Sequence, residues 1–222
     1  RGSPVPNKKY NFRADPARVS IYEEMGVDLV SLANNHAFDY GPEALTDTLQ
    51  TLDAAGIARV GAGEDLAEAS RPCYYILNGY LVAILAGFDF TSQTTRHASE
   101  TESGVFAMLD RTNICAQVRA CKELSDFVFV FTHWGVESTT KLSSGQKSGG
   151  RALIDSGADL VVGAHPHVVQ GVEYYKGKLI AYSLGNFVFS SYALTSAILQ
   201  VELHADGTLR PVFVPCFQQN NL

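Results

Sequence analysis

The chain has 222 residues, of which 46% are hydrophobic, and its 17 basic and 23 acidic residues give a net charge of −6. A chain of this length can bury one sizeable core, and no Pro/Ser-rich or charged linker divides it, so we expect a single domain over residues 1–222. The acidic balance, with no basic run longer than Lys8-Lys9, argues against a nucleic-acid surface.

The longest uncharged stretch runs from Cys73 to Phe88, and Asn78-Gly79 interrupts it with the residues of a tight hairpin turn. The stretch therefore predicts a hairpin rather than a membrane span. The first residues show no basic segment followed by an apolar one, so we expect no signal peptide or anchor within this chain. Four cysteines without CxxC spacing give no zinc-knuckle signal, and we interpret them as small buried residues: Cys73, Cys115, Cys121 and Cys216.

The first half of the chain predicts helices alternating with short strands. Asp15-Pro16 opens a helix that ends near Met25, and Gly41-Pro42 opens a second helix that ends near Gly56. The other elements expected here are strands over 27–33 and 58–60, a helical turn over 66–69, a hairpin of 73–77 with 80–85, and a polar loop over 89–104.

The second half twice repeats a helix followed by a buried strand. Asp110 can cap a helix that leads to the strand 126–131, and a helix over 144–156 leads to the strand 159–163. Two hairpins are expected after them, 171–175 with 179–183 and 197–203 with 209–214. This order predicts an α/β fold of stacked layers with antiparallel edge hairpins.

Four of the six histidines follow apolar strands. His36 and His133 each come after one predicted strand, and His165 and His167 leave a third strand one residue apart. In open α/β sheets, loops converge at the carboxyl ends of strands, and binding sites are built there. Neutral imidazole is also the commonest protein ligand for divalent metals. The pattern therefore predicts a metal site.

Each of these residues also has a simpler interpretation. A single histidine at a strand end is more often a hydrogen-bonded rim residue than a ligand, and only the recurrence at three strand ends favours the metal site. Trp134, the only tryptophan, can wall a substrate cleft or pack under the sheet. Arg13 can contact an anionic substrate, although a solvated surface charge is the commoner role for such a residue.

Four ordered motifs resemble the CapA family, the bacterial capsule proteins associated with poly-γ-glutamate synthesis. These motifs are SLANNHAFDYG at 31–41, THWGVE at 132–137, GADLVVGAHPHVVQ at 157–170 and YSLGNF at 182–187. The match covers nearly the whole chain in order. The resemblance implies a layered αββα fold similar to that of calcineurin-like metallophosphoesterases.

The resemblance also implies roles for individual residues. Asn35 would supply an amide-oxygen ligand, and His36 would contact the substrate and protonate a leaving group. Glu137 and Glu173 fall at acidic positions typical of the family, and the role of Glu173 would be only to orient a ligand histidine. The metal ligands would be His133, His165 and His167.

One departure from the family pattern concerns the start of the domain. The family begins with one strand ending in Gly-Asp-x-Met and a second ending in Asn-Leu-Glu, and neither motif is present here. By resemblance, their Asp and Glu would complete the metal centre. We therefore expect that the sequence either enters the family domain after those strands or belongs to a member that has lost half of its cluster.

The implied cofactor is a divalent metal, with two ions about 3.5–4 Å apart as in other binuclear sites. Mixed histidine, amide and carboxylate ligands suit Mn²⁺ and are compatible with Zn²⁺ or Fe, and the sequence does not choose among them.

Three hypotheses on function remain open. The first is a metal-dependent, phosphoesterase-like hydrolase of capsule or cell-envelope polymer metabolism that acts on an anionic polymer or a phosphoester. The second is a non-catalytic accessory protein that binds poly-γ-glutamate or membrane proteins of the capsule synthase. The third is metal-free acid/base chemistry, such as peptide epimerisation. The resemblance implies an extracytoplasmic, envelope-associated location.

Overall fold

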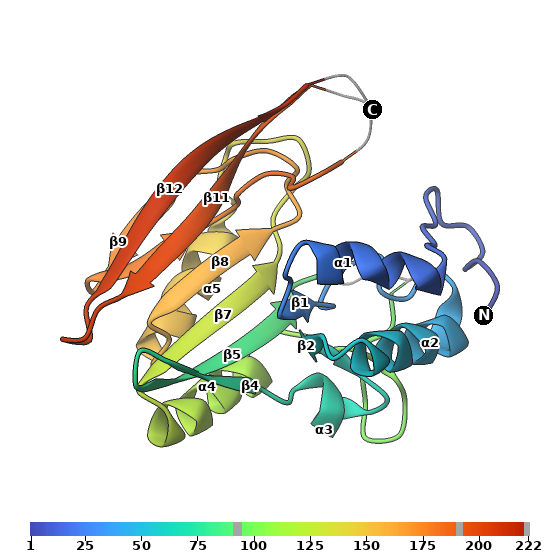
Figure 1. Cartoon of the computed structure of the whole chain (residues 1–222), viewed down its shortest axis with the longest axis horizontal. Helices are drawn as coiled ribbons and strands as arrows, with labels where there is room; N and C mark the ends of the chain where they lie inside the picture. The colour runs from blue at the N-terminus through green and yellow to red at the C-terminus, as the bar shows by residue number, and fades with distance from the viewer. Residues whose placement is uncertain (91–94, 190–192, 220–222) are drawn as a thin grey trace. The chain divides into compact units, whose positions relative to one another are not determined.

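The computed structural model describes residues 1–90, 95–189 and 193–219 as helices, strands and connecting loops (Figure 1). The chain divides into two compact units. The first unit contains residues 1–73 and 84–114, and the second contains residues 74–83 and 115–222. The strand β5 (Tyr80–Phe88) passes from the second unit into the first. In the part of the chain that the structure describes, no helix has the length and apolar character needed to cross a bilayer.

The first unit begins with a short helical segment and a small parallel sheet. A 3-10 turn (η1, Pro16–Val19) precedes α1 (Ser20–Glu24), and β1 (Leu29–Ser31) pairs in parallel with β2 (Ala58–Val60) across α2 (Gly41–Ala54). The expected helix over 15–25 therefore starts as a 3-10 turn, because Pro16 at its first position and the Asp15 cap tighten that turn. The expected strand over 27–33 is shorter, because the chain already turns after Ser31.

The rest of the first unit contains α3 (Leu66–Ala69) and a two-stranded sheet of β3 (Ala62–Gly63) with β6 (Gly104–Val105). The sequence predicted α3 but not this sheet. The end of the predicted polar loop is β6, and residues 91–94 of that loop lie outside the described residues.

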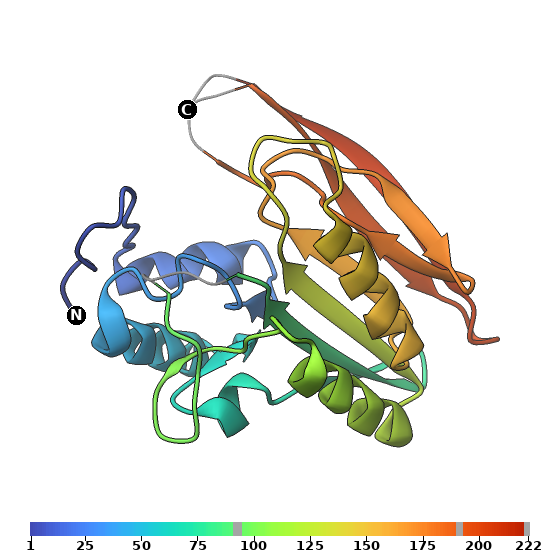
Figure 2. The same cartoon turned by 180° about the vertical axis from the view of Figure 1, so that it is seen from behind.

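The second unit is built on a six-stranded sheet with the strand order β4-β5-β7-β8-β10-β9. Its central pair is parallel, with Phe129 opposite Leu160 and His133 opposite Ala164. Figure 2 shows α4 and α5 over one face of this sheet. The elements not yet delimited are β4 (Cys73–Leu77), α4 (Thr112–Leu124), β7 (Phe127–His133), α5 (Ser144–Asp155), β8 (Leu160–Ala164), β9 (Val172–Tyr175) and β10 (Lys178–Ala181).

A long antiparallel hairpin of β11 (Leu194–Leu203) and β12 (Leu209–Gln218) completes the second unit. Leu199 and Val201 of β11 pack against a buried cluster of Leu160, Val162 and Leu179. The sheet is thus covered by helices on one face and by this hairpin on the other, whereas the sequence predicted the hairpin only as an antiparallel edge element. All four cysteines are free thiols, of which Cys115 and Cys121 are buried and Cys73 and Cys216 are half-buried.

Candidate functional site

Two of the predicted ligand histidines meet at the carboxyl end of β7 and β8. The strands pair in register so that His133 lies opposite Ala164, and His165 is the next residue along. Nδ1 of His165 lies 3.1 Å from Nε2 of His133, and both side chains are half-buried or better. Glu137 contributes a carboxylate oxygen 3.9 Å from Nε2 of His165. The parallel register therefore brings together three of the residues that the sequence singled out.

The backbone at this strand end is held in an unusual conformation. The φ angles of His165 and His167 are +100° and +60°. A residue with a Cβ atom in the left-handed region costs on the order of 1–3 kcal/mol, and such residues cluster at functional sites. Two backbone hydrogen bonds from the loop after β7 hold the strained segment, from Trp134 N to the Ala164 carbonyl (3.1 Å) and from Ser138 N to the Pro166 carbonyl (2.9 Å).

The spacing of the two imidazoles fits a shared metal ion. Two nitrogen ligands that each lie about 2.0–2.1 Å from one ion, at a right to tetrahedral angle, are roughly 2.9–3.4 Å apart. The 3.1 Å between His133 and His165 falls in that range. Within residues 1–90, 95–189 and 193–219, no group of three or more His, Cys, Asp or Glu side chains is arranged to hold an ion. The donor pair fits a metal, and the full ligand set stays a prediction.

The ring of His167 is oriented by a hydrogen bond that suits a metal ligand. Its Nδ1 is 2.7 Å from Oδ1 of Asn186, which can only accept, so Nδ1 donates and Nε2 is the nitrogen that would face a metal ion. The ring also packs against Phe189, with centroids 4.9 Å apart. Asn186 lies in the YSLGNF motif, but no role was predicted for it, because its contact with His167 depends on the fold.

His36, in the first unit, is oriented by a buried carboxylate. Its Nδ1 lies 2.8 Å from Oδ2 of Asp39, whose side chain is 2% exposed. Asp39 also accepts from the Phe12 N–H (2.7 Å) and from the Lys8 ammonium. A carboxylate in this position accepts a hydrogen bond from Nδ1–H and orients the ring, so Nε2 is the nitrogen that can meet a bound group. Asp39 was not selected from the sequence, although the His-x-x-Asp spacing inside the motif at 31–41 is a usable signal.

The backbone of Asn35, the predicted amide ligand, is held by two hydrogen bonds to its carbonyl oxygen. Its carbonyl accepts from the Lys8 ammonium and from Oγ1 of Thr95 (3.1 Å). Lys8 therefore ties the N-terminal segment to both Asn35 and Asp39.

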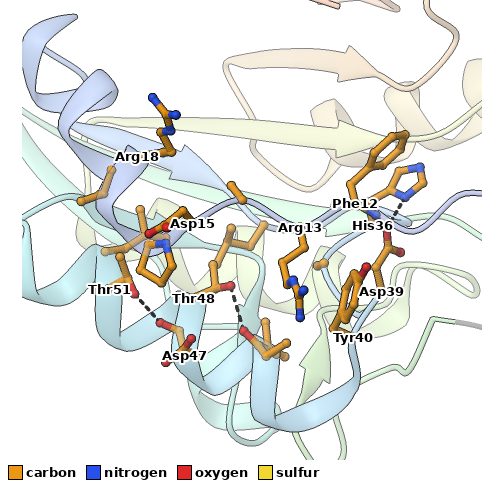
Figure 3. A pocket seen from close by; sticks show the side chains of 18 of the residues that line it. Phe12, Arg13, Asp15, Arg18, His36, Asp39, Tyr40, Asp47, Thr48 and Thr51 are labelled. Carbon is orange, nitrogen blue, oxygen red and sulfur yellow. Dashed lines mark hydrogen bonds and ion pairs between the residues drawn. The ribbon is translucent and has the colours of Figure 1, made fainter. Parts of the chain in front are cut away.

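A cavity of about 980 Å³ within the first unit opens beside His36 (Figure 3). Arg13 lines it, with its guanidinium 4.6 Å from the centroid of the Tyr40 ring. The side chains of Asp15, Asp47 and Arg18 line it as well, so the charges around the cavity are mixed. Arg13 is thus placed where it can meet a ligand that also reaches His36.

Trp134 and Glu173 occupy structural positions in the second unit. Trp134 is fully buried, and its indole N–H donates to the Tyr182 carbonyl (2.9 Å), which favours the packing role over a cleft wall. The Glu173 carboxylate accepts from the Tyr182 hydroxyl (2.6 Å) and from Nε of Arg151 (2.8 Å). These two hydrogen bonds lower the pKa of Glu173. Burial, together with the bond to Glu173, raises the pKa of Tyr182.

The chain matches the family model described as bacterial capsule synthesis protein PGA_cap over residues 1–191. It is 35% identical over 209 residues to the capsule biosynthesis protein CapA of Bacillus anthracis, a match that covers 91% of this chain and 50% of the relative. It is also 35% identical over 208 residues to the PGA biosynthesis protein CapA of Bacillus subtilis, covering 92% and 54%.

A third relative is a probable polyglutamine synthesis accessory protein of Mycobacterium tuberculosis, which is 31% identical over 196 residues, covering 84% of this chain and 52% of the relative. The chain therefore spans about half the length of the curated relatives it matches.

Two solved structures share the fold. The NAD nucleotidase of Haemophilus influenzae superimposes with a TM-score of 0.60 at 15% identity, over 90% of this chain and 41% of that one. A phosphatase from Mycoplasma pneumoniae gives a TM-score of 0.52 at 11% identity, over 91% and 86%. At these identities the likeness concerns the fold, and it confirms the layered α/β architecture expected from the sequence.

Proposed function

Because the chain belongs to the bacterial capsule synthesis protein family PGA_cap, we propose that it acts in the synthesis of a capsule polymer of the poly-γ-glutamate kind, as a metal-dependent, phosphoesterase-like hydrolase. The substrate in this proposal is an anionic polymer or a phosphoester, and the partners are membrane proteins of the capsule synthase. The location is the cell envelope, outside the cytoplasm.

The observation that carries the proposal is the pair of imidazole nitrogens 3.1 Å apart at a strained strand end. The two imidazoles are held at the spacing of ligands to one ion, in a backbone conformation that costs free energy. A segment kept in that state without any gain in packing is typical of a binding or catalytic site.

Individual side chains would then have separate tasks. His133, His165 and His167 would hold the metal, with Glu137 and Asn35 as oxygen donors. Divalent ions at such sites act as Lewis acids that stabilise negative charge on phosphoryl or carbonyl oxygens. His36 would protonate the leaving oxygen through Nε2, because its Nδ1 is committed to Asp39.

Asp39 has a supporting role in that proton transfer. Its carboxylate is buried and accepts three hydrogen bonds, so it holds the His36 ring in one orientation. Arg13, at the wall of the adjoining cavity, would attract the anionic part of the substrate.

The test is a hydrolysis assay with Mn²⁺, Zn²⁺ or Fe²⁺, using a chromogenic phosphomonoester, a phosphodiester and poly-γ-glutamate as substrates. We expect metal-dependent turnover of at least one substrate, which is lost in His165→Ala and in His36→Ala. His204→Ala is the matched control, because His204 is an exposed histidine of the same chain that pairs with Glu202. Equal turnover in all three variants, or none in the unaltered protein with any metal, contradicts the hydrolase.

A non-catalytic accessory role is the second candidate. The observation in its favour is that, among the described residues, no third His, Cys, Asp or Glu side chain is placed to hold an ion together with His133 and His165. One relative of this chain is itself named a probable polyglutamine synthesis accessory protein. Binding of poly-γ-glutamate that is saturable, independent of added metal and without turnover supports this role over the hydrolase.

A further inference from the structure

A buried hydrogen-bonded chain of two glutamines joins the two loops that carry the histidine pair. Gln146, in the first turn of α5, and Gln170, after His167, are 1% and 4% exposed. Nε2 of Gln146 donates to Oε1 of Gln170 (2.8 Å), and Nε2 of Gln170 donates to the Thr139 carbonyl (2.9 Å). Oε1 of Gln146 accepts from the Ser143 N–H (3.0 Å). The middle and the end of the loop 134–143 are thereby connected to the segment that follows His167.

The direction of every donor in this chain is fixed by the backbone groups at its two ends. The Thr139 carbonyl can only accept, so the nitrogen of Gln170 must face it and the oxygen of Gln170 must face Gln146. The Ser143 N–H can only donate, so the oxygen of Gln146 must face it. A change of either amide to a carboxylate or a hydrocarbon therefore breaks at least one link.

Gln146 also has no room to move. The φ angle of Gly135 is +86°, and a Cβ atom added there would lie 2.7 Å from Nε2 of Gln146. The amide thus packs directly on the backbone two residues after His133. On the other side, the backbone N–H of Gln170 donates to the Ser183 carbonyl (3.0 Å), which anchors the residue to the segment after β10.

We propose that Gln146 and Gln170 are positioning residues that hold the loop after His133 and the His165–His167 segment in the arrangement that brings the imidazoles to 3.1 Å. The significance of that arrangement for metal binding rests on the proposed function, but the arrangement itself can be measured without metal. An unsatisfied buried amide or carbonyl costs roughly 1–3 kcal/mol, so the loops separate or admit water when a link is lost.

The experiment compares Gln170→Leu and Gln170→Glu with the unaltered protein. Leucine keeps the volume and removes both links, whereas glutamate keeps an acceptor for Gln146 and places an oxygen against the Thr139 carbonyl. Asp159→Asn is the control, because Asp159 is a buried polar residue at the opposite end of β8. The first readout is the imidazole ¹⁵N spectrum of the metal-free protein, and the second is the dissociation constant for Zn²⁺ alone.

We expect the signals of His133 and His165 to shift or split in both Gln170 variants and to stay unchanged in Asp159→Asn. The dissociation constant for Zn²⁺ should rise about 10–100-fold in the Gln170 variants, the usual effect of losing an outer-shell partner. If Gln170→Leu fails to fold, the same two measurements on Gln170→Glu test the positioning role.

Unchanged imidazole signals in the folded Gln170 variants, or an equal change in the control, would overturn the positioning role. Absence of Zn²⁺ binding by the unaltered protein would instead refute the proposed metal site, and the imidazole spectra would still decide the role of the glutamines.

Discussion

The two ends of the strand pair β7 and β8 are built on opposite principles. At the amino end, the buried Asp159 carboxylate accepts from the Lys122 ammonium (2.9 Å), the Lys178 ammonium (2.7 Å) and the Val128 N–H (3.0 Å). At the carboxyl end, two imidazoles lie nitrogen to nitrogen in a segment with positive φ angles. The first end matches its charges with partners, and the second brings like groups together.

The amino end of the strand pair therefore stabilises the fold, whereas the carboxyl end carries the candidate site. A carboxylate with several partners lowers the free energy of the folded state, because each hydrogen bond replaces one lost from water. Strained histidines raise that free energy unless a ligand binds between them. Substitutions at the two ends should therefore affect different measurements.

The largest expected effect is that of His165→Ala on metal affinity. The variant removes one of the two facing imidazoles and, because alanine also has a Cβ atom, leaves the positive φ angle of the backbone as it was, so Zn²⁺ binding should weaken by more than the about 10–100-fold that an outer-shell change costs. Isothermal titration with Zn²⁺ measures the loss, and urea unfolding should show little change in stability. Undiminished affinity would place the metal elsewhere, with His204→Ala again as the exposed-histidine control.

Gly163→Ala should produce the largest loss of stability. Gly163 precedes the strained segment, and a Cβ atom there would lie 2.1 Å from the Tyr182 carbonyl oxygen and 2.3 Å from Nε1 of Trp134. Because the Tyr182 carbonyl belongs to the backbone, relief requires the strands to separate, at about 3 kcal/mol or more.

Urea or thermal unfolding measures this loss, and Gly145→Ala provides the contrast. A Cβ atom at Gly145 would meet only Oγ of Ser143 at 3.7 Å, and alanine is favoured over glycine in a helix by roughly 0.5–1 kcal/mol. Equal stability of the two variants would mean that Gly163 is not limited by space.

The strand ends could be predicted from the sequence, but the partners of the histidines could not. Apolar runs followed by histidine indicated β7 and β8 and the meeting of His133 with His165, because parallel register places successive strand ends side by side. Asp39 and Asn186 were not identified, because a carboxylate or amide in a motif has no evident partner until the loops are folded.

The missed sheet of β3 and β6 has a related cause. Each strand is only two residues long, so no periodic pattern is available. The paired residues also lie far apart in sequence, Gly63 and Gly104 by 41 positions and Ala62 and Val105 by 43. The roles expected for Arg13, Asn35 and Glu137 stay predictions, because the structure fixes where these residues lie and not what they bind.

Asp159→Ala should have a smaller effect on stability than Gly163→Ala and none on the histidine pair. It leaves the Val128 N–H, which is buried, without its acceptor, and it leaves Lys122 and Lys178 without a shared anion. Since both lysines are more than a third exposed, water screens their charges, and the expected cost is about 1–3 kcal/mol, mostly from the buried N–H. Urea unfolding measures the cost, and a changed Zn²⁺ affinity would show that the two strand ends are coupled.

Glu173→Gln should give the smallest effect, and one that depends on pH. The Tyr182 and Arg151 hydrogen bonds hold the pKa of Glu173 below its ordinary value of 4.5. A carboxyl with a depressed folded-state pKa stabilises the fold above the unfolded-state pKa, and this contribution is lost as the pH falls through the lower, folded-state pKa. The pair is partly exposed, so we expect less than about 1 kcal/mol at neutral pH. Urea unfolding at pH 7 and at acidic pH should show a difference in stability between the variant and the unaltered protein only at pH 7. A difference that persists in acid would mean that packing of the side chain, rather than its charge, stabilises this edge of the sheet.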